Sequence, residues 1–113
     1  MIAMRYNGKD FLLAEVFIYR VSSTNALCRA FLSLNNEEEC YAFLEDLCTI
    51  KEIIGMAQRL QVAKMLQAGA SYTTITRATG ASTATISRVS KCCEYGSGGY
   101  STVMERTVQE DET

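Results

Sequence analysis

Apolar residues recur every three or four positions over much of the chain, a spacing that predicts amphipathic helices. Ser22, Ser23 or Thr24 is expected to cap a first helix that runs to residue 34, with a stripe of Leu27, Ala30, Phe31 and Leu34. Asn35 or Asn36 then caps a second helix, whose first turn holds three glutamates where the helix dipole favours anions. The stripe of this second helix is Cys40, Phe43, Leu44 and Leu47.

A longer helix is predicted to follow. Thr49 and Glu52 have the spacing of a capping box, in which each side chain accepts a hydrogen bond from the other's backbone N–H, and Gly69 ends the helix after Ala68. Its apolar side chains extend well beyond one face: Ile50, Ile53, Ile54, Met56, Ala57, Leu60, Val62, Ala63, Met65 and Leu66. Such a helix must be covered on several sides, and three short neighbouring helices can hardly do this in a monomer. We therefore predict a homodimer.

The secondary structure at the two ends of the chain is less clearly indicated by the sequence than that of the middle. Residues 1–10 look like a loose start, and the run FLLAEVFIYRV that follows fits either a strand or a short buried helix. We therefore divide the chain into an N-terminal segment of uncertain structure (1–21), a domain (22–109) and an acidic tail (110–113). A glycine-rich break is expected at residues 94–101, followed by a last short helix from Ser101 to Val108.

Residues 71–94 have the pattern of a helix-turn-helix. Gly80 can adopt the left-handed backbone conformation that the turn needs, and Ala81 keeps the corner tight. The apolar anchors that would face one another across the turn are Ile75, Ile86 and Val89. Thr76 departs from the pattern, because many such motifs have alanine at that closely packed position. The alternative is a plain helical hairpin with glycine as its C-cap.

The second helix of this motif is expected to begin at Ser82 or Thr83 and to carry small and basic side chains on its outer face. Small hydroxyl and methyl groups let a helix approach base edges closely, and arginine or lysine reaches guanine or phosphate. The expected DNA-binding residues, taken from both helices, are Thr83, Ala84, Ser87, Arg88, Lys91, Thr73 and Arg77. For Arg88, a solvated surface arginine is the alternative.

Composition and charge further limit the classes of function that are possible. The chain has 113 residues and a formal net charge of −2, but residues 53–93 carry five basic side chains and no carboxylate. This stretch would not repel a polyanion; an accident of composition is the alternative. The absence of histidine excludes histidine-based triads and zinc sites. Since the chain also lacks a nucleophile–base pair and a carboxylate cluster for metals, we expect neither an enzyme nor a metal site.

The five cysteines are an odd number without a C-x-x-C pair, and we expect free thiols in a reducing cytoplasm. Cys92 and Cys93 would point about 100° apart on a helix, which suits neither a disulfide nor a shared metal. The apolar run Phe11–Tyr19 contains Glu15, is too short to span a bilayer and lacks the features of a signal peptide. We therefore expect a cytoplasmic protein with no membrane partner.

The sequence LCTIKEIIGMAQRLQVAKMLQAGASYTTITRATGASTATISRVSKC (47–92), with EEECYAFLEDLCT before it, resembles the Trp repressor family. The phrase GASTATISRV is typical of its YerC/YecD branch. The resemblance, which extends over residues 25–105, implies an all-α, Trp-repressor-like helical bundle that forms an intertwined homodimer. Its two helix-turn-helix heads would lie about 34 Å apart, one turn of DNA. The resemblance also implies that Thr83, Ala84 and Ser87 face the bases.

The same resemblance implies a candidate effector pocket made by Arg59, Arg88, Thr49, Val89 and Cys92. Arg59 and Arg88 match the two arginines that hold tryptophan in Trp repressors, and Thr49 matches a threonine that lines the pocket. Val89 and Cys92 stand where Trp repressors have glycine and serine, and their added bulk opposes the binding of an indole. We therefore expect no cofactor, and leave tryptophan or a similar co-repressor as the open alternative.

These observations lead to one main hypothesis. The protein would be a sequence-specific DNA-binding transcriptional regulator, most simply a repressor, that reads the major groove as a homodimer. Its partners would be double-stranded DNA and a second copy of the chain. The alternative is a non-catalytic helical dimer that uses the same hairpin to bind protein. For Arg59, a salt bridge to Glu52 or Glu45, or a phosphate contact, is the alternative to a ligand role.

Overall fold

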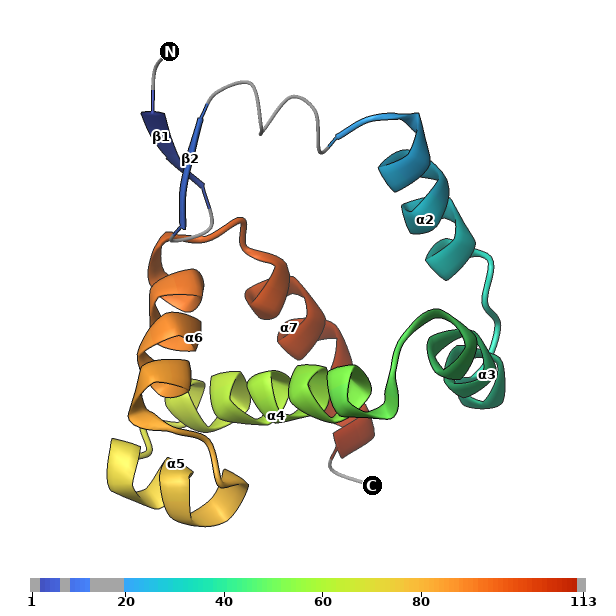
Figure 1. The fold of residues 1–113 in the computed structure, drawn as a ribbon. Helices are drawn as coiled ribbons and strands as arrows, with labels where there is room; N and C mark the ends of the chain where they lie inside the picture. Colours follow the sequence, from blue (N-terminus) through green and yellow to red (C-terminus); the bar gives the residue numbers. More distant parts are fainter. Residues whose placement is uncertain (1–2, 7–8, 13–19, 112–113) are drawn as a thin grey trace. The chain divides into compact units, whose positions relative to one another are not determined.

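The computed structural model describes residues 3–6, 9–12 and 20–111, with side chains described for residues 20–108 (Figure 1). Six helices occupy most of these residues: α2 (Ser22–Leu32), α3 (Glu37–Leu47), α4 (Ile50–Gln67), α5 (Tyr72–Thr79), α6 (Thr83–Tyr95) and α7 (Gly99–Asp111). The predicted all-α class is confirmed. Among the described residues, no helix combines the length and the apolar character needed to cross a membrane.

Two short strands precede the helices. Strand β1 (Ala3–Tyr6) pairs with β2 (Lys9–Leu12) in a two-stranded sheet, so the loose start predicted for residues 1–10 is wrong where the structure describes them. The overlooked signal is the dipeptide Asn7-Gly8 between the strands, which is typical of two-residue hairpins. Of the ambiguous run 11–21, Phe11 and Leu12 lie in β2 and Val21 is the residue before α2; residues 13–19 lie outside the described residues.

The chain divides into two compact units at Ile54, within α4. Helices α2 and α3 and the first turn of α4 belong to the first unit, and the rest of α4 belongs with α5, α6 and α7 to the second. The candidate helix-turn-helix therefore lies wholly within the second unit.

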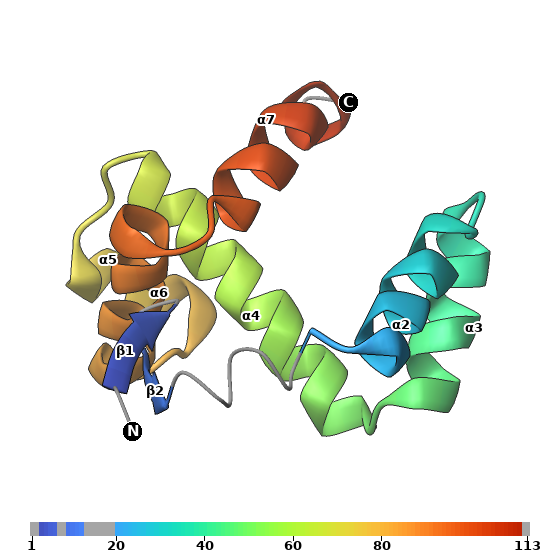
Figure 2. The ribbon, with the colours of Figure 1, turned by 90° about the horizontal axis from the view of Figure 1, so that it is seen from above.

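In the first unit, α2 and α3 form a helical hairpin (Figure 2). The rings of Phe31 and Phe43 meet edge to face, with 5.1 Å between their centroids, a favoured aromatic geometry. None of the residues of α2 or α3 is buried, and Leu32 is 84% exposed. The predicted stripes therefore form a contact between the two helices and leave much of their apolar surface accessible.

The starts of these helices test the predicted caps. Asn36 caps α3, because its side chain accepts a hydrogen bond from the Glu39 N–H at 2.9 Å, as predicted. Helix α2 differs, because Val21 is its N-cap residue and the Thr24 hydroxyl reaches back to the Val21 N–H at 2.9 Å. Thr24 thus satisfies the helix start from inside the first turn rather than from the cap position. Helix α2 also ends at Leu32, two residues earlier than predicted.

Helix α4 begins and ends as predicted, to within one residue. The Thr49 hydroxyl accepts from the Glu52 N–H at 3.1 Å, and the Glu52 carboxylate accepts from the Thr49 N–H at 2.9 Å. The bond from the Thr49 N–H, with a smaller contribution from the Thr49 side chain, holds the pKa of the exposed Glu52 carboxyl below its ordinary value of 4.5. At the other end, Gly69 adopts a φ of +84°, a conformation that glycine takes without a steric penalty.

The second unit has a small apolar core. Every one of its four helices contributes to the core, together with the turn between α5 and α6; the buried residues are Val62, Ala63, Ile75, Ala81, Ile86, Val89 and Met104. Leu60, Met65, Leu66, Ala70 and Tyr100 pack around them and are partly buried. This core fixes α5 and α6 relative to the second half of α4 and to α7.

Helix α7 is longer than predicted. It runs from Gly99 to Asp111, whereas the expected helix covered only Ser101 to Val108. Gly98 precedes it with a φ of +83°, and the Thr102 hydroxyl donates to the Gly98 carbonyl oxygen at 3.1 Å in its first turn. Met104, 7% exposed, anchors the helix on the core. The glycines therefore end α6 and begin α7 within a short connection.

Candidate nucleic-acid interface

Helices α5 and α6 and the turn between them form a helix-turn-helix, and each helix carries its own start signal. The Ser71 hydroxyl accepts a hydrogen bond from the Thr74 N–H at 3.2 Å at the start of α5. The Ser82 hydroxyl accepts from the Thr85 N–H at 3.1 Å at the start of α6. Side-chain caps of this kind satisfy backbone donors that have no partner within the helix.

Gly80 makes the turn, as predicted. Its φ of +73° and ψ of +4° place it in the left-handed region, and its N–H bonds to the Thr76 carbonyl oxygen at 2.8 Å. The Thr79 hydroxyl completes the corner by accepting from the Ala81 N–H at 3.1 Å. The four predicted inward residues are all buried, with exposed fractions of 1% or less: Ile75, Ala81, Ile86 and Val89.

A surface of seven predicted DNA-binding residues covers the outer side of this motif, and we call it the reading face: Thr73, Arg77, Thr83, Ala84, Ser87, Arg88 and Lys91. Ser87 is half-buried and the other six are exposed. Their exposure follows from the burial of Ile75 on α5 and of Ile86 and Val89 on α6, because a helix that buries one face presents the other. Three of the seven, Thr73, Arg77 and Thr83, line a common hollow between α5 and α6.

The cations of the reading face are available to a ligand. Among the side chains described for residues 20–108, Arg77, Arg88 and Lys91 form no ion pair, and residues 53–93 contain no carboxylate with which to form one locally. A positively charged surface without internal partners attracts anions, above all a polyanion. Within the same described side chains, no cluster of three or more potential metal ligands occurs.

One hydrogen bond ties the turn of the motif to α4. The Gln58 side-chain amide donates to the Thr79 carbonyl oxygen at 3.1 Å, in partly buried surroundings. This carbonyl lies at the end of α5, where the helix itself offers no N–H donor to it. Gln58, which was not singled out from the sequence, therefore positions the turn and with it the start of α6.

The residues expected to form an effector pocket have different surroundings. Val89 is 1% exposed and belongs to the core, and Arg88 is exposed on the reading face. Thr49 uses its hydroxyl in the capping box of α4. Arg59 interacts with the Tyr100 hydroxyl and opposes the rise in the pKa of that phenol, which burial causes.

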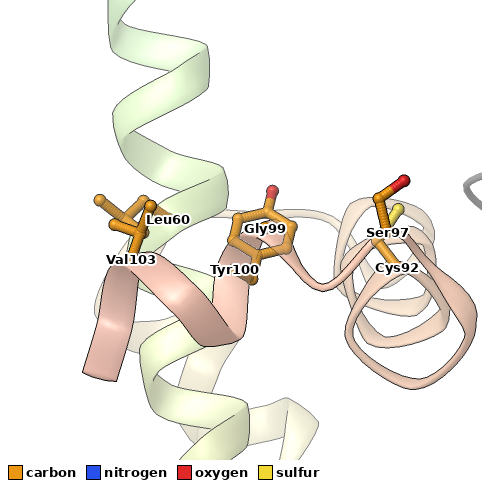
Figure 3. Close-up of a pocket in the computed structure, with 6 residues that line it drawn as sticks. All are labelled: Leu60, Cys92, Ser97, Gly99, Tyr100 and Val103. Atoms are coloured by element: carbon orange, nitrogen blue, oxygen red, sulfur yellow. The ribbon is translucent and has the colours of Figure 1, made fainter. Parts of the chain in front are cut away.

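A hollow of about 390 Å³ does lie beside α7 in the second unit, and Cys92 is the expected pocket residue that lines it. In Figure 3, Tyr100 projects between Leu60 and Val103 on one side and Cys92 and Ser97 on the other. The hollow is thus lined mainly by apolar side chains. Burial raises the pKa of the neighbouring Cys93 thiol, with Cys92 and Glu94 adding to the rise, so this thiol stays protonated at neutral pH.

Two residues that line the hollow of the helix-turn-helix were not among those expected from the sequence. Tyr72 and Thr76 line the hollow between α5 and α6 together with Thr73, Arg77 and Thr83. The signal was the departure of Thr76 from the small residue typical of its position. Thr76 is exposed, so its larger side chain lies at the surface between the helices instead of being packed beneath the turn.

The family profile of the Trp repressor protein matches residues 22–108 of this chain. The chain therefore belongs to the Trp repressor family, whose fold serves DNA-binding regulation and not catalysis. The match covers both helical units and the whole helix-turn-helix, and it confirms the predicted family.

Individual relatives agree with this assignment. The uncharacterised protein YerC of Bacillus subtilis is 51% identical over 94 residues, which are 83% of this chain and 89% of YerC. The crystal structure of a TrpR-like protein from Eubacterium eligens matches with a TM-score of 0.77 at 47% identity, over 79% of this chain and 92% of that one. A proposed Trp repressor from Staphylococcus aureus matches with a TM-score of 0.77 at 45% identity, over 85% and 94%.

Proposed function

We propose that this protein is a sequence-specific transcriptional regulator, a repressor in its simplest form, that binds the major groove of DNA through α6. The observation that carries the proposal is the division of α6 into two faces. Ile86 and Val89 are buried in the core, while Thr83, Arg88 and Lys91 are exposed on the opposite side. A helix of this kind can enter the major groove while its inner face keeps the protein folded.

The electrostatics support the same function. Small side chains at Thr83, Ala84 and Ser87 would let α6 approach the base edges, and Arg88 and Lys91 would reach guanine or phosphate groups. The carboxylate-free stretch 53–93 gives the reading face a positive field that would steer it toward DNA. The acidic residues of the chain lie outside this stretch.

Homodimerisation is part of the proposal. Apolar side chains that a monomer would bury are exposed in this chain, among them Ile50 at 73%, Ile54 at 63% and Leu32 at 84%. Exposed apolar surface on this scale is typical of a protein–protein interface. A dimer would present two reading faces to successive major grooves, about 34 Å apart, and would double the contacts to the phosphates.

Fluorescence anisotropy with duplex DNA tests this function. A labelled duplex that the purified protein selects from a randomised library should bind with salt-sensitive affinity. The slope of log affinity against log salt should approach about −0.9 for each neutralised phosphate. A folded protein that selects no duplex at low salt would refute the proposal.

The alternative, a helical dimer that binds protein through the same surface, rests on the exposure of the reading face alone. It predicts similar affinity for DNA and for polyanions such as heparin, without a preferred sequence. Competition between a selected duplex, a scrambled duplex and heparin separates the two functions.

A further inference from the structure

Two neighbouring residues of α4 bond to the chain just before and just after α6. The Gln58 amide donates a hydrogen bond at 3.1 Å to the carbonyl oxygen of Thr79, at the end of α5. The Arg59 guanidinium donates to the hydroxyl oxygen of Tyr100, the second residue of α7. All four residues belong to the second compact unit. Helix α4 therefore bonds to both ends of the segment that contains α6.

The guanidinium of Arg59 lies along α4 rather than extending into solvent. Its Nη1 atom is 3.6 Å from the position that a Cβ of Gly55, one turn earlier, would occupy, and Arg59 is half-buried. Long side chains of a helix point back toward its N-terminus in this way. The cation that contacts Tyr100 is therefore held at a defined place on α4.

The ring of Tyr100 is also held from both sides. It packs against the apolar core and is partly buried, and it lines the hollow of about 390 Å³ beside α7. Figure 3 shows the ring between Leu60 and Val103 on one side and Cys92 and Ser97 on the other. The chain itself thus supplies an aromatic ring to this hollow and a cation to the hydroxyl of that ring.

The connection between α6 and α7 transmits the position of Tyr100 to α6. It consists of residues 96–98 only. The Gly96 N–H bonds to the Cys92 carbonyl oxygen at 2.9 Å, and a Cβ at Gly96 would clash with this same oxygen. At the other end, the Thr102 hydroxyl donates to the Gly98 carbonyl oxygen at 3.1 Å. Because the connection is short and bonded to both helices, a displaced Tyr100 would displace the end of α6.

The two bonds from α4 add a directional constraint to the packing of α6. Ile86 and Val89 bury its inner face in the core, and the hydrophobic effect that drives their burial has no preferred direction. Hydrogen bonds do have a preferred direction. A bond near each end of α6 therefore limits how far the helix can tilt on the core.

We propose that Gln58 and Arg59 are positioning residues, which hold both ends of α6 against α4 and so preform the reading face. Because their partners belong to the chain itself, the protein would bind DNA without a small-molecule effector. The inference rests on the proposed function and describes how that function is regulated. A binding surface that is already in its competent conformation loses no affinity to a conformational change.

A loosened α6 should lose specific binding and keep non-specific binding. Contacts to base edges need side chains at defined positions, whereas non-specific binding depends on the charges that face the phosphates. The bonds made by Gln58 and Arg59 change none of the charges of the reading face. Their loss should therefore lower the affinity for a selected duplex and leave the affinity for a scrambled duplex unchanged.

The test uses the full chain, a duplex that the wild-type protein selects from a randomised library, and a scrambled duplex of the same length. Tyr100→Phe keeps the ring and the net charge and removes the hydroxyl that bonds to Arg59. Tyr95→Phe is the matched control, because this tyrosine is 74% exposed at the end of α6. Circular dichroism and sedimentation velocity confirm that each variant has the fold and assembly state of the wild type.

We expect Tyr100→Phe to bind the selected duplex roughly tenfold more weakly, the usual effect of losing one hydrogen bond to a charged group. Its affinity for the scrambled duplex and its slope of log affinity against log salt should match the wild type. Gln58→Ala should show the same pattern, and Tyr95→Phe should bind like the wild type. Tyr100→Phe would overturn the inference by binding the selected duplex normally, or by losing equal affinity for both duplexes.

Chemical rescue tests the role of the ring and its hydroxyl separately. Tyr100→Ala opens a space beside the hollow, and an apolar cavity of this kind can bind a small aromatic molecule. p-Cresol has the ring and hydroxyl of tyrosine, and toluene has the ring alone. p-Cresol should restore more of the affinity of Tyr100→Ala for the selected duplex than toluene does. Equal effects of the two compounds would overturn the inference.

The last experiment adds a mixture of the standard amino acids. It should leave the affinity of the wild type for its selected duplex unchanged. A wild-type protein that selects and binds a duplex only with this mixture present would overturn the inference and leave the proposed function standing. A folded wild-type protein that selects no duplex, with or without the mixture, would refute the function itself.

Discussion

The side-chain amide of Gln58 donates a hydrogen bond to the carbonyl oxygen of Thr79 at 3.1 Å and so connects α4 to the turn of the helix-turn-helix. Gln58→Ala leaves this partly buried carbonyl without its partner, and we expect the free energy of unfolding to fall by about 1 kcal/mol. Urea unfolding followed by circular dichroism measures the change. Gln61→Ala, an exposed position on the same helix, is the control; equal effects of the two substitutions would show that the bond contributes nothing specific.

The capping box of α4 makes stability depend on pH. The pKa of the Glu52 carboxyl is below its ordinary value of 4.5 in the folded chain, because Thr49 bonds to the ionised form. A lowered folded-state pKa stabilises the protein above the ordinary value, and this stabilisation is lost as the pH falls through the folded pKa. At neutral pH the wild type should therefore be more stable than Glu52→Gln.

The measurement for this prediction is urea unfolding of both proteins from neutral pH down to below 4.5. The difference in the free energy of unfolding should shrink as the pH falls, since the glutamine side chain keeps the hydrogen-bond acceptor and lacks only the charge. A difference that stays constant over this range would contradict the assigned role of Glu52.

The two faces of α6 predict opposite outcomes for two acidic substitutions. Thr83→Glu adds a carboxylate to an exposed position and should abolish DNA binding by repelling phosphates, while stability changes by no more than about 0.5 kcal/mol. Ile86→Asp buries a charge at a position that is 0% exposed and should unfold the head. Anisotropy and thermal unfolding measure the two effects. Unchanged DNA affinity in Thr83→Glu would mean that the reading face is assigned to the wrong surface.

The exposed apolar residues of α4 predict how a dimer would respond to substitution. Ile54 is 63% exposed in the single chain, so Ile54→Glu should leave the monomer folded. If two copies bury this residue, the dissociation constant should rise at least tenfold, because each buried isoleucine contributes roughly 1.5–3 kcal/mol. Sedimentation velocity over a range of concentrations gives the constant. Gln61→Glu, another exposed position on α4, should behave like the wild type.

Much of the fold could be predicted because its signals are local. Asn36, the pair Thr49 and Glu52, and Gly80 each act within a few residues of their position, and a cap or a left-handed turn needs no distant partner. The inward positions of the helix-turn-helix also followed from the local pattern, since Ile86 and Val89 are three residues apart on α6 and Ile75 is the large aliphatic residue of α5.

Other features depend on contacts between residues far apart in sequence. The bond from Gln58 to Thr79 and the contact between Arg59 and Tyr100 join separate helices, and no periodicity indicates them. Helix α7 joins the core through Met104, whose neighbours there lie on other helices. The hollow beside Thr76 could not be predicted, because it depends on the angle between α5 and α6. The unusual threonine itself was visible in the sequence.

The self-contained caps of α5 and α6 also bear on the order in which the molecule assembles. Ser71, Gly80 and Ser82 define both helices and the corner between them through bonds that span at most four residues. Structure built from such short-range contacts closes only small loops and forms rapidly. We therefore expect this hairpin to form early in folding, before α7 packs against the core through Met104.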